Sequence, residues 1–274
     1  MFRLFAALAV SLAASALGSA PSVAQEAASR CLAVANVAPR IMPAAFIPIQ
    51  DGMERPQAAA VTIRYLGHST FLITTPEGVT IATDYNGFAG GATPRAVTMN
   101  RAHTSHFTES PDPAIEHVLR GWNPEGGPAE HRLELGDALI RNVPTDLRSW
   151  GGGTRIPDGN SIFIFEVAGL CIGHLGHLHH LLADEDLAFI GQLDIVMVPV
   201  DGGYTMDQSA MVETLQVLKA RLILPMHYFG QTTLNGFLTR LGETFAVEMS
   251  DGPDVTVSAA TLPASPTVLV LPGY

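Results

Sequence analysis

Residues 61–75 read VTIRYLGHSTFLITT, two short runs of β-prone residues separated by the Gly-His-Ser of positions 67–69. β-branched and aromatic residues favour strands, and a glycine-containing break between two such runs is typical of a turn. The stretch therefore predicts a β-hairpin with His68 in its turn. A third β-prone run at 79–83, which ends before Asp84, extends the same pattern.

The order of predicted elements changes along the chain. In the first half we predict further strands over 97–99, 133–143, 161–167 and 170–174, and a helical turn over 113–119 with Asp112 as its N-cap. In the second half we predict helices over 184–190, 207–219 and 234–241, between strands over 195–200, 222–226, 245–249 and 255–258. Strands followed by β/α alternation predict an α/β (α+β) protein with sheets packed together and helices outside.

Composition excludes several classes of protein. The chain has 274 residues, of which 47% are hydrophobic, which is too apolar for a disordered protein. Its 26 acidic and 15 basic side chains give a net charge of −11. Nucleic acids and anionic lipid surfaces need basic partners, so we expect neither as a binding partner. The sequence does not indicate the oligomeric state.

The first 24 residues have the pattern of an export signal. Arg3 is followed by a charge-free run that is rich in Ala and Leu and ends in Pro-Ser-Val-Ala. A basic start, an apolar centre and small residues at the end predict a secretory signal cleaved after Ala24, with a retained membrane anchor as the alternative. We therefore expect a periplasmic or secreted protein with an N-terminal arm at 25–60, a folded domain at 61–274 and no membrane contact after cleavage.

Two cysteines, Cys31 and Cys171, would enter an oxidising compartment with the exported chain. They could form a disulfide there. Cys171 also lies in the apolar run 167–172, where it could equally be an inert buried thiol.

Histidine is the most informative residue type in the chain. Eight of the ten histidines lie in turns or directly after predicted strands, where the loops of α/β sheets bind ligands. They are His68, His103, His106, His174, His177, His179, His180 and His227. A lone histidine is usually structural, but several strand-end histidines from distant segments predict a metal site, because zinc sites need three or four convergent ligands.

Four stretches resemble the metallo-β-lactamase superfamily, in particular its UlaG-like, L-ascorbate-6-phosphate lactonase-like branch. They read YLGHSTFLI at 65–73, IATD at 81–84, PVDGGYTMD at 199–207 and LPMHY at 224–228. The resemblance spans residues 61–230 and implies an αββα sandwich of two mixed sheets with the active site at one edge. It also implies a metal-dependent hydrolase.

The metal-binding motif differs from the family pattern. The family's His-x-His-x-Asp-His motif reads RAHTSH at 101–106, with Arg101 and Ser105 replacing a histidine and the aspartate. No histidine stands near 143–146, where the third motif is expected, and the bridging aspartate of the fourth motif falls at His177. The ligands that the resemblance implies are His103, His106, His177 and His227.

Four imidazoles without a bridging carboxylate predict one divalent transition metal rather than two. Zn²⁺ is the first choice, with Fe, Mn or Ni as alternatives. Arg101 would add a fixed positive charge that disfavours a second metal ion and could pair with an anionic group of the substrate.

The remaining candidate residues surround this centre. We predict that His68 and Arg101 contact the substrate and that Asp84 supports a ligand or lines the pocket. The catalytic candidates are Asp201, His180 and Tyr204: Asp201 or His180 as the base, with His179 as a further option, and Tyr204 as a donor to the substrate oxyanion.

The sequence thus supports two functional hypotheses. The first is an exported, mononuclear metallo-hydrolase that uses a metal-bound water on a small-molecule lactone, ester or phosphoester. The second is a catalytically inactive periplasmic protein of the same fold that binds a ligand or partner. The substitutions at Arg101 and Ser105 motivate the second hypothesis, and the histidines at 177, 179 and 180 favour the first.

Overall fold

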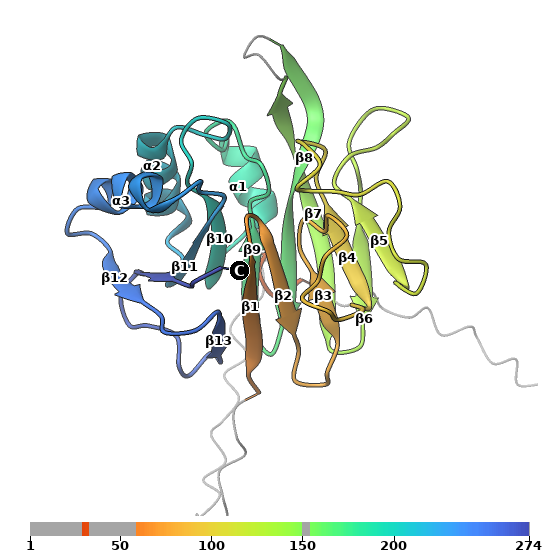
Figure 1. Ribbon diagram of the computed structural model, residues 1–274, viewed down its shortest axis with the longest axis horizontal. Coiled ribbons are helices and arrows are strands. Elements are labelled where there is room, and N and C mark those ends of the chain that lie inside the picture. The colour runs from red at the N-terminus through yellow and green to blue at the C-terminus, as the bar shows by residue number, and fades with distance from the viewer. Residues whose placement is uncertain (1–28, 33–58, 150–153, 274) are drawn as a thin grey trace, which may run out of the picture.

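The computed structural model describes residues 29–32, 59–149 and 154–273, which form two sheets and three α-helices (Figure 1). The predicted signal at 1–24 and most of the predicted arm at 25–60 lie outside the described residues. Among the described residues, every helix is too short or too polar to span a membrane.

The first sheet has six strands in the order β13-β1-β2-β3-β4-β5. The predicted hairpin is present, with β1 and β2 antiparallel, whereas β3, β4 and β5 run parallel. Its strands are β1 (Val61–Gly67), β2 (Thr70–Thr74), β3 (Thr80–Ala82), β4 (Ala96–Met99), β5 (His117–Arg120) and β13 (Asp254–Val257).

The second sheet has eight strands in the order β12-β14-β11-β10-β9-β8-β7-β6. Strands β9, β10, β11 and β14 are parallel neighbours, so their carboxyl ends lie at one edge. The strands are β6 (Arg132–Leu135), β7 (Ala138–Arg148), β8 (Arg155–Val167), β9 (Leu170–His174), β10 (Ile195–Pro199), β11 (Leu222–Met226), β12 (Ala246–Met249) and β14 (Thr267–Val270).

The central strand β10 of the second sheet is buried on both faces. Its Met197 packs into the core between the two sheets, with Phe71 and Phe163. Its Val196 and Val198 point to the opposite side and pack in the core that includes the helices. The helices are α1 (Asp184–Ile190), α2 (Gln208–Leu218) and α3 (Gln231–Arg240), and Figure 1 shows α2 and α3 beside β10 and β11.

The fold prediction is confirmed as two packed mixed sheets with helices outside. Within the described residues, loops rather than helices cover the outer face of the first sheet, where Tyr85, Ile115 and Trp122 form a small core with β4. The structure contains the predicted helices over 184–190 and 207–219, and Asp207 accepts hydrogen bonds from the backbone N–H groups of Ser209 and Ala210 as the N-cap.

Three local predictions were wrong. The predicted helical turn over 113–119 is a tight turn followed by β5, because Asp112 accepts the backbone N–H of Ala114 and the next residues pair with β4. The predicted strand over 133–143 is two strands, β6 and β7, joined at Gly136, whose φ of 60° permits the reversal. Strand β14 was not predicted.

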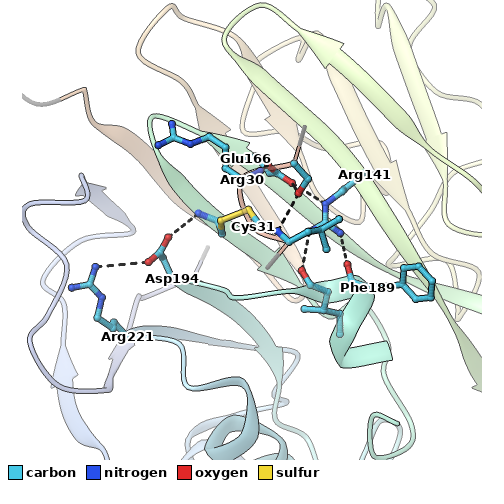
Figure 2. Close-up of a disulfide and its surroundings, with 11 residues drawn as sticks. Arg30, Cys31, Arg141, Glu166, Phe189, Asp194 and Arg221 are labelled. Carbon is cyan, nitrogen blue, oxygen red and sulfur yellow. Dashed lines mark hydrogen bonds and ion pairs between the residues drawn. A yellow bond between two sulfur atoms is a disulfide. The ribbon is translucent and has the colours of Figure 1, made fainter. Parts of the chain in front are cut away.

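A disulfide joins Cys31 to Cys171, which decides between the two states that the sequence left open (Figure 2). It attaches the segment 29–32 to β9. The backbone N–H of Gln192 donates to the Cys31 carbonyl at 2.9 Å, which holds the segment beside the end of α1. The bridge spans 140 residues of sequence, so it restricts a large part of the unfolded chain.

A buried ion pair lies beside this disulfide (Figure 2). Nε of Arg141 donates to Glu166 Oε1 at 2.8 Å, and both side chains are at most 9% exposed. Ser29 Oγ and the backbone N–H of Arg30 donate to the same carboxylate at 2.5 and 2.8 Å. Arg141 also donates to the carbonyls of Phe189 and Ile190, so one cluster fixes segment 29–32, two strands and the end of α1.

The double variant Cys31→Ser/Cys171→Ser should be less stable than the wild type by about 2–4 kcal/mol, because the unfolded chain regains conformational entropy. Urea unfolding measures this difference. Dithiothreitol should lower the wild type to the level of the double variant and leave the variant unchanged. Equal unfolding midpoints for oxidised and reduced wild type would show that the bridge contributes nothing.

Glu166→Gln should destabilise the fold at pH 7 by about 3 kcal/mol, because it leaves Arg141 buried without its counter-ion. Burial raises the pKa of Glu166, but the hydrogen bonds from Arg141 and Ser29 outweigh burial and lower it below the usual 4.5. The stabilisation is therefore complete above pH 4.5 and is lost as the pH falls through the lowered pKa.

Unfolding of wild type and Glu166→Gln from pH 7 down into the acid range below pH 4.5 tests this, and the difference should shrink at the acid end. The control is Glu116→Gln, which removes the exposed pair with Arg95 and should change stability little. A difference for Glu166→Gln that does not depend on pH would contradict the proposed charge pairing.

Candidate metal centre

Three imidazoles meet where the two sheets approach each other. His103 and His106 follow β4 of the first sheet, and His227 follows β11 of the second. Nε2 of His227 lies 3.1 Å from Nε2 of His106 and 3.4 Å from Nε2 of His103. Nitrogens bound to one tetrahedral Zn²⁺ at about 2.0–2.1 Å would be about 3.3 Å apart. The spacing of these atoms therefore fits a shared metal ion.

An oxygen atom lies next to Nδ1 in each of these three rings. Ser105 Oγ is 2.6 Å from His103 Nδ1, Asp84 Oδ2 is 2.5 Å from His106 Nδ1, and Asp201 Oδ1 is 3.0 Å from His227 Nδ1. Such partners fix the orientation and tautomer of a metal-binding imidazole. Nε2 is the nitrogen that each ring presents to the centre, with Nδ1 of His103 and of His106 hydrogen-bonded and Nδ1 of His227 next to the Asp201 carboxylate.

His68 completes a group of four ligand atoms that all lie within 4.8 Å of one another. Its ring centroid is 4.1 Å from that of His227, and its buried Nε2 has no hydrogen-bond partner. Its φ of 50° is in the left-handed region, as is the φ of 55° at His227, and the backbone N–H of His227 donates to the His68 carbonyl at 2.6 Å. Strained backbone of this kind persists where surrounding contacts impose it, commonly at functional sites.

This group contains His68, whereas the ligand set predicted from the sequence contains His177. His177 stands beside it, with ring centroids 4.9–5.0 Å from those of His103, His106 and His227. Its Nδ1 is hydrogen-bonded to His179 Nε2 at 2.8 Å, and its Nε2 is buried without a partner. The hairpin turn brings His68 over His227, which spacing along the chain did not show.

Two buried asparagines hold the loops of the centre and were missed in the sequence. Asn100 Nδ2 donates to Asp84 Oδ1 at 2.9 Å, and Asn100 Oδ1 accepts the backbone N–H of Ser161 at 2.8 Å. Asn160 Oδ1 accepts the backbone N–H of His177 at 2.7 Å. A Cβ on Gly176 would lie 2.4 Å from Asn100 Nδ2, so this glycine is needed for the close approach. The only sequence signal for Asn100 and Asn160 was their position, directly after β4 and within β8.

Burial and mutual repulsion keep the imidazoles of His68, His103 and His106 neutral at neutral pH, which leaves each a lone pair for a metal. Burial, followed by the nearby His227 and His103, lowers the pKa of His68 to about 4. Burial, followed by the nearby His227, also lowers the pKa values of His103 and His106. Burial strongly lowers the pKa of His177, again with repulsion from His106 and His227.

The two carboxylates behind the ligands have opposite pKa shifts. Burial raises the pKa of Asp84, opposed by His174 and by the hydrogen bond from Asn100. Burial also acts to raise the pKa of Asp201, but the contacts with His227 and Thr205 outweigh it and lower the pKa. Asp201 Oδ2 accepts backbone N–H groups of the following turn, including that of Tyr204 at 2.5 Å. Asp201 therefore lies on the Nδ1 side of the His227 ring, and both of its carboxylate oxygens already accept hydrogen bonds.

The other predicted site residues lie around this centre. His180 Nε2 accepts a hydrogen bond from the backbone N–H of Asp146, and His180 Nδ1 donates to the carbonyl of Leu181. Neither nitrogen is therefore free to act as a base in this arrangement. Tyr204 is 48% exposed and packs against Phe229. Arg101 is exposed two residues before His103 and forms no ion pair with another described residue. Burial lowers the pKa of His179 to about 4, and Arg148 contributes to the same shift.

A histidine cluster at the edge of two packed mixed sheets defines the class as metallo-β-lactamase-like proteins. Residues 62–227 match the family described as "Beta-lactamase superfamily domain". The chain belongs to that superfamily.

Relatives and solved structures agree with this assignment. The chain is 26% identical over 184 residues to a UPF0173 metal-dependent hydrolase of Methanoregula boonei, covering 61% of this chain and 81% of the relative. It is 23% identical over 245 residues to one of Polaromonas, covering 69% and 86%. A putative Zn-dependent hydrolase of the metallo-beta-lactamase superfamily from Thermotoga maritima has the same fold, with a TM-score of 0.55 and 24% identity over 77% of this chain and 98% of that chain.

Substitution of each histidine tests the ligand set. After expression with added zinc, the wild type should hold about one equivalent of metal. His103→Ala, His106→Ala and His227→Ala should lose it, and His68→Ala should bind it more weakly. His177→Ala should keep the stoichiometry of the wild type.

Metal analysis by plasma mass spectrometry gives the readout. His117→Ala is the matched control, because His117 lies on β5 outside the cluster. Loss of metal in His177→Ala together with full retention in His68→Ala would show that the ligand set expected from the sequence was correct.

Proposed function

We propose that this protein is an exported, mononuclear metal-dependent hydrolase of the UlaG-like branch, with His68, His103, His106 and His227 as the metal-binding residues. The observation that carries the proposal is the convergence of the Nε2 atoms of His103, His106 and His227, each ring with an oxygen next to its Nδ1. Neutral imidazoles suit Zn²⁺ first, and also Fe, Mn or Ni. The bound ion would supply Lewis acidity and lower the pKa of water to about 7.

A single metal follows from the donor set. The four-residue group contains only histidines, and the nearby carboxylates of Asp84 and Asp201 lie behind the rings. At the position where the superfamily pattern expects the bridging aspartate, this chain has His177. A neutral imidazole does not compensate the charge of two cations as a carboxylate does.

The protein's own residues bind and orient the reacting groups. The acceptor atoms of Asp201 and His180 already accept hydrogen bonds, so our proposal assigns neither residue as the base. His177 Nε2 is buried and unpartnered, which leaves it to bind a water or a substrate oxygen. Exposed Arg101 would pair with an anionic group of a small-molecule lactone, ester or phosphoester.

Export is supported by the disulfide between Cys31 and Cys171, because disulfides form and persist in oxidising compartments. We therefore place the mature protein in the periplasm or outside the cell. N-terminal sequencing of protein recovered from the host periplasm should begin at Gln25.

A second candidate function is a non-catalytic binding protein of the same fold. It is favoured by the replacement of two motif residues by Arg101 and Ser105. In the structure, however, the Ser105 hydroxyl lies 2.6 Å from His103 Nδ1 and orients that ring. The substitution thus keeps the metal-binding geometry, which favours the hydrolase.

A panel of lactones, aryl esters and phosphodiesters should reveal metal-dependent turnover, which a chelator abolishes and added Zn²⁺ restores. His227→Ala should abolish it as well, whereas the control His117→Ala should keep the activity of the wild type. Initial rates measured spectrophotometrically check this outcome. Turnover that survives in His227→Ala would contradict the metal role, and metal-loaded protein with no turnover on the panel would favour the binding protein.

A further inference from the structure

Exposed apolar side chains gather around the metal centre. Single exposed hydrophobic residues are normal, but their grouping at one place is informative. Of the eight large hydrophobic side chains exposed in the described part of the chain, four follow a residue in or around the centre by one to four positions. These are Phe88 after Asp84, Leu181 after His180, Tyr204 after Asp201 and Phe229 after His227.

Phe229 and Tyr204 form an aromatic wall directly beside the ligands. The Phe229 ring is 61% exposed, yet its centroid is 5.6 Å from that of His227 and 5.9 Å from that of His68. Tyr204 meets Phe229 at 5.4 Å with an interplanar angle of 66°, the edge-to-face arrangement that aromatic pairs prefer. The wall therefore presents apolar surface to solvent directly next to the rings of His227 and His68.

The other two side chains belong to loops that contact the same centre. The loop of Phe88 lies against the loop of the ligands, because Asn86 Nδ2 donates to the Ser105 carbonyl at 3.4 Å. Leu181 lines a cavity of about 660 Å³ together with His179 and Arg148. Arg148 Nη2 donates to the carbonyl of Gly203 at 2.8 Å, which places this cavity beside the loop of Tyr204. A cavity of this size holds a small organic molecule.

We propose that Phe229 and Tyr204 bind an apolar, preferably aromatic, substituent of the substrate, next to the bond that is hydrolysed. This inference rests on the proposed function and names the chemical class of its substrate. An apolar group held against the wall would be removed from water, while its carbonyl or phosphoryl end reaches the histidines. The substrate is thus an ester, lactone or phosphoester with an aryl or alkyl group beside the reacting centre.

Binding of two hydroxamates to the Zn²⁺-loaded protein tests the proposal without requiring turnover. Acetohydroxamate and benzohydroxamate share the metal-chelating group and differ in the apolar substituent. Isothermal titration calorimetry should show benzohydroxamate binding about tenfold more tightly, because its ring buries additional apolar area. Phe229→Ala and Tyr204→Ala should each reduce this preference, measured as the ratio of the two affinities in the same variant, to about twofold or less.

Phe189→Ala is the matched control, because Phe189 is equally exposed, at 58%, but lies on α1 outside the wall, and the variant should keep the tenfold preference. If acetohydroxamate binds but benzohydroxamate binds no more tightly, or if the preference survives in Phe229→Ala, the binding role of the aromatic wall is contradicted and the proposed hydrolase is not. If the preference is present but no substrate is turned over, the binding role of the wall stands and the hydrolase function is contradicted. Failure of both probes to bind removes the metal site, and with it this inference.

Discussion

The candidate metal centre depends on oxygen atoms that lie next to Nδ1 of three imidazoles. Nε2 of His227 lies 3.1 Å from that of His106 and 3.4 Å from that of His103, and such an approach of polar atoms away from water is costly unless their surroundings hold the rings in place. These oxygen atoms belong to Ser105, Asp84 and Asp201, and the three residues are themselves held in different ways. The hydroxyl is local to His103, one carboxylate is fully buried, and the other is held by the backbone of its own turn.

The architecture supplies these atoms because strand ends from both sheets meet at one edge. Parallel strands β3 and β4 deliver Asp84 and the loop of His103 and His106, while β10 and β11 deliver Asp201 and His227. The buried Asn100 and Asn160 then satisfy the loop backbone between the sheets. The exposed aromatic residues follow the same strand ends, so the surface that would meet a substrate and the groups that would bind a metal have one structural origin.

Much of the fold and part of the centre could be predicted from local pattern. Alternating β-prone runs and helix caps placed most elements, and strand-end histidines placed His103, His106 and His227 at one edge. The exchange of His177 for His68 could not be predicted, because both follow β-prone runs and only the turn at φ 50° brings the His68 ring to 4.1 Å from that of His227. The role of Asn100 was equally hidden, since its partners are 16 and 61 residues away.

The sequence by itself determined the two-sheet class, the apolar strands and the supply of histidines at their ends, because these depend on residue type and on periodicity over a few neighbours. Only the tertiary structure decided which histidines share a centre, which oxygens orient them and that Cys31 bonds to Cys171. These outcomes depend on contacts between segments far apart in the sequence, such as Cys31 and Cys171 at a separation of 140 residues, and such contacts are fixed by packing of the two sheets rather than by any local propensity.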